Sequence, residues 1–323
     1  MVSCPICNEI LTSNIPNSAF YVCEKCEAAI RKEDDMPHKQ HNIYNNEWVS
    51  GEEKKRLNTK VAHFRLRQIN KLKKTKGIEK ILDLGCGTGI LVDLLATNGY
   101  IVDGVDSSQP NIDYARSHKK GNYFLQDIES FETGKKYDLI IASHLIEHLR
   151  TPNNFFRKVR TSIKNSGYLY LATPNLSAWS AKSLWRKNLG GISGTDHRIL
   201  YSPKSLSKLL AMYNFEVIYI STKTRFNRML EEIIRTIFFK KYKEHVTQKL
   251  NHTDEIYTNH NFNRKTSYKT KHYFIRTLKN IYNFTKDSII IDLLFFIPNI
   301  ISETKNRGEE LIIICRVGPD MDI

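Results

Sequence analysis

Four of the six cysteines lie near the N-terminus and form two pairs. Each pair has the spacing Cys-x2-Cys, and fifteen residues separate the two pairs. This spacing is typical of two turns that hold one tetrahedral Zn²⁺ through four thiolates. Because four thiolates complete the metal's shell, we expect a structural zinc, with two disulfides as the alternative. The predicted ligands are Cys4, Cys7, Cys23 and Cys26.

A segment this short cannot bury enough apolar surface to fold alone, so the metal would stabilise it. We place a zinc ribbon at residues 1–38 and a linker at residues 39–56. The other two cysteines, Cys86 and Cys315, lie among glycines and in an apolar run, respectively. We expect both to be small buried side chains.

Three glycines at alternate positions follow a short apolar run in KILDLGCGTG, residues 80–89. The apolar run predicts a buried strand of a parallel sheet. The glycines predict a strand-to-helix turn that a ligand can approach closely. The helix expected at residues 90–97 would direct free backbone N–H groups at that ligand.

Two acids end the next two predicted strands. Asp106 closes the strand at residues 100–106, about 20 residues after the glycines, where a carboxylate can hold a ribose diol. The alternative is that Asp106 caps the helix that begins near Pro110. Asp127 closes a strand at residues 122–128, and its position alone marks only a polar strand end.

Strands and helices alternate through the rest of the central region, which predicts an α/β fold with a doubly wound parallel sheet. We place the core domain at residues 57–221, a helical insertion at 222–309, and the last strand and tail at 310–323. The remaining predicted strands are 137–143, 167–175, 216–221 and 310–317, and the helices are 54–74, 153–163 and 203–212.

The glycine run with Asp83 ahead of it, Asp106, Asp127, SHLIEHL (143–149) and ATPN (172–175) follow one another in order. Together they resemble the class I S-adenosylmethionine-dependent methyltransferases. Within that superfamily, the IEHL, ATPN and DHRILYSPKSL segments are similar to the branch that modifies small molecules, quinone precursors and glycan or lipid-linked sugars. The resemblance implies a Rossmann-like sheet of seven mostly parallel strands.

The resemblance also implies that S-adenosyl-L-methionine is the methyl donor. In the family, the acid matching Asp127 contacts the adenine amino group, and the residue matching Ile128 contacts the ring edge. The implied cofactor-binding residues are Asp83, Gly85, Cys86, Gly87, Gly89, Asp106, Ser107, Asp127, Ile128 and Ser143.

A hydroxyl acceptor must lose its proton during methyl transfer, and histidine suits that task near neutral pH. His197, with Asp196 to orient it, is the first candidate for the base. His148, beside Glu147, is the second candidate, and His144 is the third. A structural hydrogen-bonding role is the alternative for each. His144, Glu147 and His148 also match the H-x-x-E-H pattern of zinc peptidases. This segment begins at the end of a predicted strand and not on a helix.

The chain of 323 residues has a net charge of +15, and the charge is uneven. Residues 223–286 hold 15 Lys or Arg against 5 Asp or Glu, interleaved with aromatic residues. Three interpretations compete for this insertion: a substrate lid, a surface for an anionic membrane that carries a lipid-linked sugar, and a groove for single-stranded RNA. The corresponding functions are methylation of a sugar, glycan or small molecule, and methylation of RNA. A binding module without catalysis is a further alternative.

The N-terminus shows no basic region followed by an apolar run, as a secretory signal would. No apolar stretch reaches the roughly 18–20 residues that a membrane span needs. We therefore expect a cytoplasmic protein, with peripheral contact at the inner face of the membrane as a variant of that expectation. The sequence does not predict an oligomeric state.

Overall fold

The computed structural model describes residues 2–11, 13–14, 19–32, 52–178, 196–223 and 309–319. The chain divides into two compact units, of which the first contains Met1–Lys223 and Thr304–Ile323. The second unit, Thr224–Glu303, lies outside the described residues. The basic and apolar parts of the predicted insertion therefore lie outside the described residues, as does most of the predicted linker.

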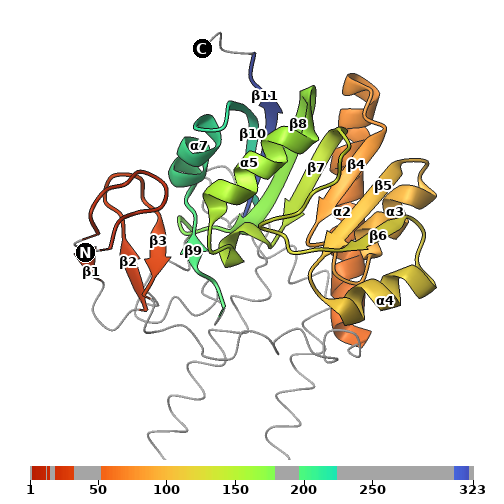
Figure 1. The fold of residues 1–323 in the computed structure, drawn as a ribbon, viewed down its shortest axis with the longest axis horizontal. Coiled ribbons are helices and arrows are strands. Elements are labelled where there is room, and N and C mark those ends of the chain that lie inside the picture. The colour runs from red at the N-terminus through yellow and green to blue at the C-terminus, as the bar shows by residue number, and fades with distance from the viewer. Residues whose placement is uncertain are drawn as a thin grey trace, which may run out of the picture. The chain divides into compact units, whose positions relative to one another are not determined.

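Seven strands form one sheet in the order β10-β11-β8-β7-β4-β5-β6 (Figure 1). The pairs β4–β5, β4–β7, β5–β6 and β7–β8 are parallel, and β11 is antiparallel to both β8 and β10. The predicted Rossmann-like sheet is confirmed. Its strands are β4 (Lys80–Leu84), β5 (Ile101–Asp106), β6 (Asn122–Leu125), β7 (Tyr137–Ser143), β8 (Ile163–Pro174), β10 (Phe215–Lys223) and β11 (Glu310–Val317).

The order of the strands reverses beside β4. From β4 the chain adds β5 and then β6 on one side, and it returns to place β7 on the other side. In sheets of this kind, ligands bind outside the carboxyl ends of the strands at such a reversal. The glycine turn directly follows β4 and His144 directly follows β7, so both begin at this edge.

Side chains alternate along each strand between two apolar layers. Ile81 of β4 packs in one cluster, whereas Leu82 and Leu84 pack in the other. Helices α2, α3 and α4 contribute to the first layer, and α5 and α7 contribute to the second. Because both faces are covered, the strands are nearly continuous apolar runs, which is why they could be predicted.

The helices match the predicted ones within a few residues. They are α2 (Glu52–Lys76), α3 (Ile90–Thr97), α4 (Gln109–His118), α5 (Pro152–Ser162) and α7 (Pro203–Ala211), with a 3-10 turn η2 (Ile146–His148). Helix α7 begins at a capping box, in which Ser202 and Ser205 bond each other's backbone N–H. In the part of the chain that the structure describes, no helix is long and apolar enough to cross a bilayer.

A second, smaller sheet joins the cysteine segment to the core. Its order is β1-β2-β3-β9, and every pair is antiparallel. The strands are β1 (Ser13–Asn14), β2 (Phe20–Val22), β3 (Ala29–Arg31) and β9 (Ile199–Leu200). The cysteines also pack in the same apolar cluster as Leu82 and Leu84 of β4. The cysteine segment and the large sheet therefore share one core.

Candidate functional site

The glycine turn after β4 takes a backbone path that favours glycine. Gly85, Gly87 and Gly89 have φ angles of 74°, 54° and 76°, in the region that side chains disfavour. A Cβ at Gly87 would meet no atom within 4 Å, so the backbone there faces open space. Cys86 points the other way, into the core, where burial raises the pKa of its thiol. Cys86 can therefore contribute to a ligand site only through its backbone.

Asp106 at the end of β5 is bonded to this turn. Its Oδ2 accepts the Gly87 N–H at 2.8 Å, and its Oδ1 accepts the Ser108 N–H at 2.8 Å. Burial raises the pKa of Asp106, while these hydrogen bonds oppose that rise. Each carboxylate oxygen has a second lone pair, so two ribose hydroxyls can still be accepted. The N-cap residue of α4 is Ser108 and not Asp106, although Asp106 accepts the N–H of that residue.

Asp83 and Ser143 lie at the ends of the two strands that flank the reversal. Burial raises the pKa of Asp83 to about 7, with Arg65 opposing the rise and Asp106 adding to it. The Ser143 hydroxyl oxygen is buried and has no hydrogen-bond partner among the described residues. A buried polar atom without a partner is costly, so a ligand that supplied one would be favoured. These observations fit a polar ligand over the Gly87 turn.

Of the remaining predicted cofactor residues, Ser107 directly follows β5, and Asp127 and Ile128 follow the neighbouring strand β6. Asp127 is exposed, and its Oδ1 accepts the Glu129 N–H at 2.8 Å in a local turn. Ile128 is buried in the core cluster beside it, and Ser107 is exposed. The local turn explains Asp127 without a ligand, and its second oxygen keeps capacity for a donor such as an adenine amino group.

The three candidate histidines, His144, His148 and His197, lie close together around Glu147 and form what we call the histidine cluster. Glu147 itself is fully buried. Its Oε2 accepts the Thr173 hydroxyl at 2.9 Å, and its Oε1 lies 3.4 Å from Nδ1 of His144 and 4.0 Å from Nε2 of His148. Burial raises the pKa of Glu147, but the imidazoles outweigh burial and hold the pKa below its usual value. The cluster therefore contains a buried carboxylate that stabilises positive charge on its neighbours.

His144 follows β7 with a φ of 51° and lies between two acids. Its Nε2 is 2.8 Å from Oε1 of Glu310, the first residue of β11. Burial lowers the pKa of His144, but Glu147 and Glu310 outweigh it and raise the pKa to about 9. The side chain is 45% exposed, so solvent moderates this attraction. An imidazole that is already protonated near neutral pH cannot accept a proton, which argues against His144 as the base.

Asp196 pairs with His148 and not with His197. Its Oδ2 lies 3.1 Å from Nδ1 of His148, so the expectation that Asp196 orients His197 is revised. Burial lowers the pKa of His148, but Asp196 and Glu147 outweigh it and raise the pKa. In return, the His148 hydrogen bond lowers the pKa of Asp196 to about 2. The His197 ring packs edge-on against His148, with 4.8 Å between the ring centres.

The H-x-x-E-H residues do not form the helix that a zinc peptidase requires. His144 has a left-handed backbone, and only Ile146–His148 are helical, in a 3-10 turn. A different set, Glu147, His148 and His197, brings three potential ligand atoms within 4.8 Å of one another. Trp179 and Trp185, which follow β8 in the sequence, lie outside the described residues.

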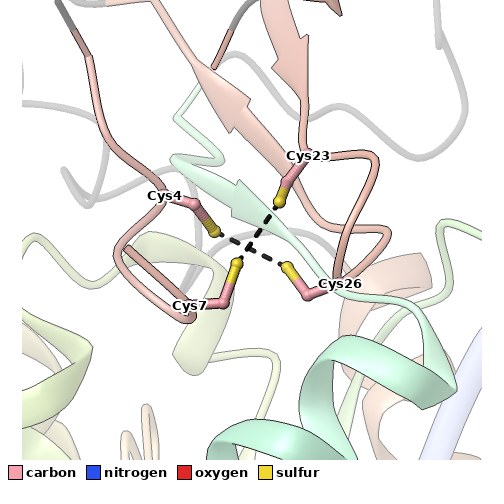
Figure 2. Close-up of side chains that lie close together, drawn as sticks. All are labelled: Cys4, Cys7, Cys23 and Cys26. Carbon is pink, nitrogen blue, oxygen red and sulfur yellow. Dashed lines mark hydrogen bonds between the residues drawn. The ribbon is translucent and has the colours of Figure 1, made fainter. Parts of the chain in front are cut away.

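The four N-terminal cysteines converge on one point from two turns (Figure 2). The sulfurs of Cys4 and Cys26 are 3.5 Å apart, and those of Cys7 and Cys23 are 3.4 Å apart. Four thiolates about 2.3 Å from one Zn²⁺ would lie roughly 3.8 Å from one another, so the donor set fits this metal. Backbone N–H groups of Ile6 and Cys7 also point at Cys4.

Sequence reasoning missed three residues that organise the site. Glu310 bonds His144, Thr173 bonds Glu147, and the Tyr201 hydroxyl donates to the Ile146 carbonyl at 3.4 Å. Glu310 could have been found, because a last strand antiparallel to β8 begins at the edge where β8 ends. The roles of Thr173 and Tyr201 could not be predicted in this way, because no sequence pattern points to their contacts.

Replacing Asp196 with Asn should lower the pKa of His148 toward its usual value, because the imidazolium loses its carboxylate. Folding raises the pKa of His148 and lowers that of Asp196, so the pair stabilises most between about pH 4 and pH 6.5. In this window we expect Asp196→Asn to lower the free energy of unfolding by about 1–3 kcal/mol. The difference should shrink as the pH falls toward the pKa of Asp196 or rises through the pKa of His148.

Denaturant unfolding across the pH range measures this difference. The control is Asp113→Asn, which removes an exposed carboxylate of α4 that accepts a hydrogen bond from the Gln109 side chain. That variant should show no such window. A loss of stability in Asp196→Asn that does not change with pH would contradict the assignment of the pair.

Comparison with known proteins supports a family assignment. The chain is 37% identical over 117 residues to a ubiquinone biosynthesis O-methyltransferase of Coxiella burnetii, covering 34% of this chain and 50% of that protein. A protein of the same name from Bartonella tribocorum is 32% identical over 131 residues, covering 39% and 50%. The chain thus spans about half the length of the curated relatives it matches.

Among solved structures, the chain is similar to a SAM-dependent methyltransferase from Archaeoglobus fulgidus. The two share 17% identity with a TM-score of 0.46, over 80% of this chain and 94% of that chain. A family model described as a methyltransferase domain matches residues 54–220. Because this match covers about half of the chain, the protein belongs to the methyltransferase-domain family.

Proposed function

We propose that the protein is an S-adenosylmethionine-dependent methyltransferase that methylates an oxygen of a small-molecule, glycan or lipid-linked acceptor. The observation that carries this proposal is the placement of two groups at one edge of the sheet. The Gly87–Asp106 pair follows β4 and β5, and the histidine cluster follows β7. The names of the Coxiella and Bartonella relatives support transfer to oxygen.

The residues around the glycine turn would hold the cofactor. The Asp106 carboxylate would accept both ribose hydroxyls, and the open backbone at Gly87 would let the ligand lie against the turn. Asp83 is a buried carboxylate with a pKa of about 7, so a positively charged amine nearby would favour its ionised form. Ser143 would supply a hydroxyl from the end of β7, and Ser107, Asp127 and Ile128 would lie toward the adenine.

When bound, S-adenosylmethionine supplies a methyl group on a positively charged sulfur, which a nucleophilic oxygen can attack. The protein's part is to orient the acceptor oxygen, to exclude water and to remove the proton. We assign proton removal to His197. His144 and His148 each lie beside carboxylates that raise their pKa values, so both hold a proton more firmly than a free imidazole does.

His148 would then position His197. The Asp196 carboxylate and Glu147 hold the His148 ring, and that ring packs edge-on against His197. Because Asp196 and His197 are adjacent in sequence, the same contact fixes the backbone that carries the base.

Replacing His197 with Ala should lower kcat for methyl transfer by about 10²–10⁴-fold. Affinity for S-adenosylhomocysteine should stay within about twofold, because His197 does not contact the glycine turn. The assay follows methyl transfer from labelled S-adenosylmethionine to phenols, sugars and lipid-linked sugars. The matched control is His118→Ala, an exposed histidine on α4 whose ring stacks on Tyr114. Turnover of His197→Ala within a few fold of the wild type would rule out His197 as the base.

We further propose that residues 1–38 form a zinc ribbon in which Cys4, Cys7, Cys23 and Cys26 bind one structural Zn²⁺. Burial raises the pKa of Cys4 to about 11 and also raises that of Cys26. These thiols would remain protonated near neutral pH without a metal, so binding would release protons. The methyltransferase core would comprise residues 57–221 and 310–323.

Metal analysis of the purified protein should find about one zinc per chain. Cys26→Ser should lose most of that zinc, because three thiolates hold it more weakly than four. The control is Cys315→Ala, which alters a buried cysteine of β11 and should keep the metal. A chain that binds no zinc would contradict the ribbon, and about two zinc ions per chain would show that Glu147, His148 and His197 bind metal as well.

A further inference from the structure

We propose that the cysteine ribbon is a positioning element of the acceptor side of the site. Through β3 and Arg31, it fixes the backbone of residues 196–200, and this backbone places Asp196 and His197 beside His148. The inference rests on the proposed function for its catalytic meaning, although the positioning itself can be measured without turnover. The metal bound by the ribbon would set the geometry of the histidines from outside the methyltransferase core.

The ribbon supplies one of the two backbones that hold residues 196–200. β3 pairs with β9 through Ala29 opposite Leu200 and Ile30 opposite Ile199. The ladder continues beyond β9, because the Arg31 N–H donates to the Arg198 carbonyl at 2.8 Å. This pairing joins parts of the chain about 170 residues apart in sequence, so no local turn could impose it.

The side chain of Arg31 also contacts the backbone of His197. Its Nε donates to the carbonyl of His197 at 2.5 Å. The guanidinium lies over the ring of Phe20, 4.5 Å from the ring centre, and Phe20 is almost fully buried. A guanidinium held in this way loses little entropy when it bonds a backbone carbonyl. Arg31 is therefore positioned in advance to fix the peptide that follows His197.

The histidine cluster supplies the second backbone. The Arg198 N–H donates to the Glu147 carbonyl at 2.7 Å, opposite the side on which Arg198 accepts from Arg31. Residues 196–200 thus lie between the ribbon and the segment that carries Glu147 and His148. A shift of β3 would move Asp196 and His197 relative to His148, whose contact with Asp196 is only 3.1 Å.

The metal site is joined directly to β3. Two residues separate Cys26 from the start of β3, and the Ala28 N–H points at the sulfur of Cys26. The Cys23 N–H donates to the Ala28 carbonyl at 2.8 Å. Zn²⁺ bound to Cys23 and Cys26 would fix where β3 begins. The path from metal to histidine therefore runs through Cys26, β3 and Arg31.

The cofactor side of the site does not share this path. The Asp106 carboxylate accepts the N–H groups of Gly87 and Ser108, both in the core domain. Helices α3 and α4 behind the glycine turn pack in the apolar layer that contains no described ribbon residue, although Leu84 of β4 shares the other layer with the cysteines. Disturbing the ribbon should therefore separate two properties: acceptor-side geometry should change while cofactor affinity is kept.

Arg31→Met tests this separation, because it keeps an unbranched apolar stem and removes the guanidinium donors. We expect kcat to fall about 10- to 100-fold, affinity for S-adenosylhomocysteine to stay within about twofold, and zinc content to be unchanged. Arg31→Lys restores one donor and should recover most of the loss. The control is Lys32→Met, whose ammonium lies over Tyr21 and whose backbone N–H bonds Ala19.

Histidine NMR provides a readout that does not depend on turnover. In Arg31→Met, the imidazole resonances of His148 and His197 should shift at constant pH, while those of His63 and His118 on α2 and α4 stay in place. Removing zinc with a chelator should shift the same two histidines. If no acceptor is ever methylated, these shifts still test the positioning. Unchanged His148 and His197 resonances in Arg31→Met, or equal losses of kcat and cofactor affinity, would overturn the proposal.

Discussion

A hydrogen bond from the Gly87 amide to the Asp106 carboxylate joins the ends of two parallel strands, β4 and β5. This hydrogen bond depends on a backbone conformation that only glycine adopts easily, because the φ angle of Gly87 is 54°. The bond holds the turn open toward solvent and leaves carboxylate capacity for a ligand. Together with the N–H groups of Gly85 and Cys86, which donate to the Val105 carbonyl, this contact holds the turn against β5.

The other half of the site depends on burying the charge of Glu147. A fully buried carboxylate is tolerated only with compensating partners, and here these are Thr173 and two imidazoles. Those partners come from β8 and from the segment after β7, while the Glu147 carbonyl accepts the Arg198 N–H from the ribbon side. Glu147 thus links the core sheet to the segment that pairs with β3, and the cysteine segment and the core sheet also share one apolar cluster.

The fold could be predicted because the inner strands β4, β7 and β11 are buried apolar runs. The cysteine turns and the glycine turn could also be predicted, because each depends on the spacing of residues that are close in sequence. The partner of Asp196 could not be predicted, because it depends on the path of residues 196–200, which pairing with β3 determines. The contact of His144 with Glu310 joins residues 166 positions apart, and it follows from the antiparallel last strand.

Calorimetric titration with S-adenosylhomocysteine tests the central claim most directly. The account predicts binding to the wild type at micromolar or tighter concentration. It also predicts a loss of about 10- to 100-fold, or about 1.4–2.8 kcal/mol, in Asp106→Asn, since one oxygen that accepts a ribose hydroxyl becomes a donor. Asp113→Asn should bind as the wild type does. Absence of binding to the wild type, or equal affinity in Asp106→Asn, would contradict the assignment of this edge as the cofactor site.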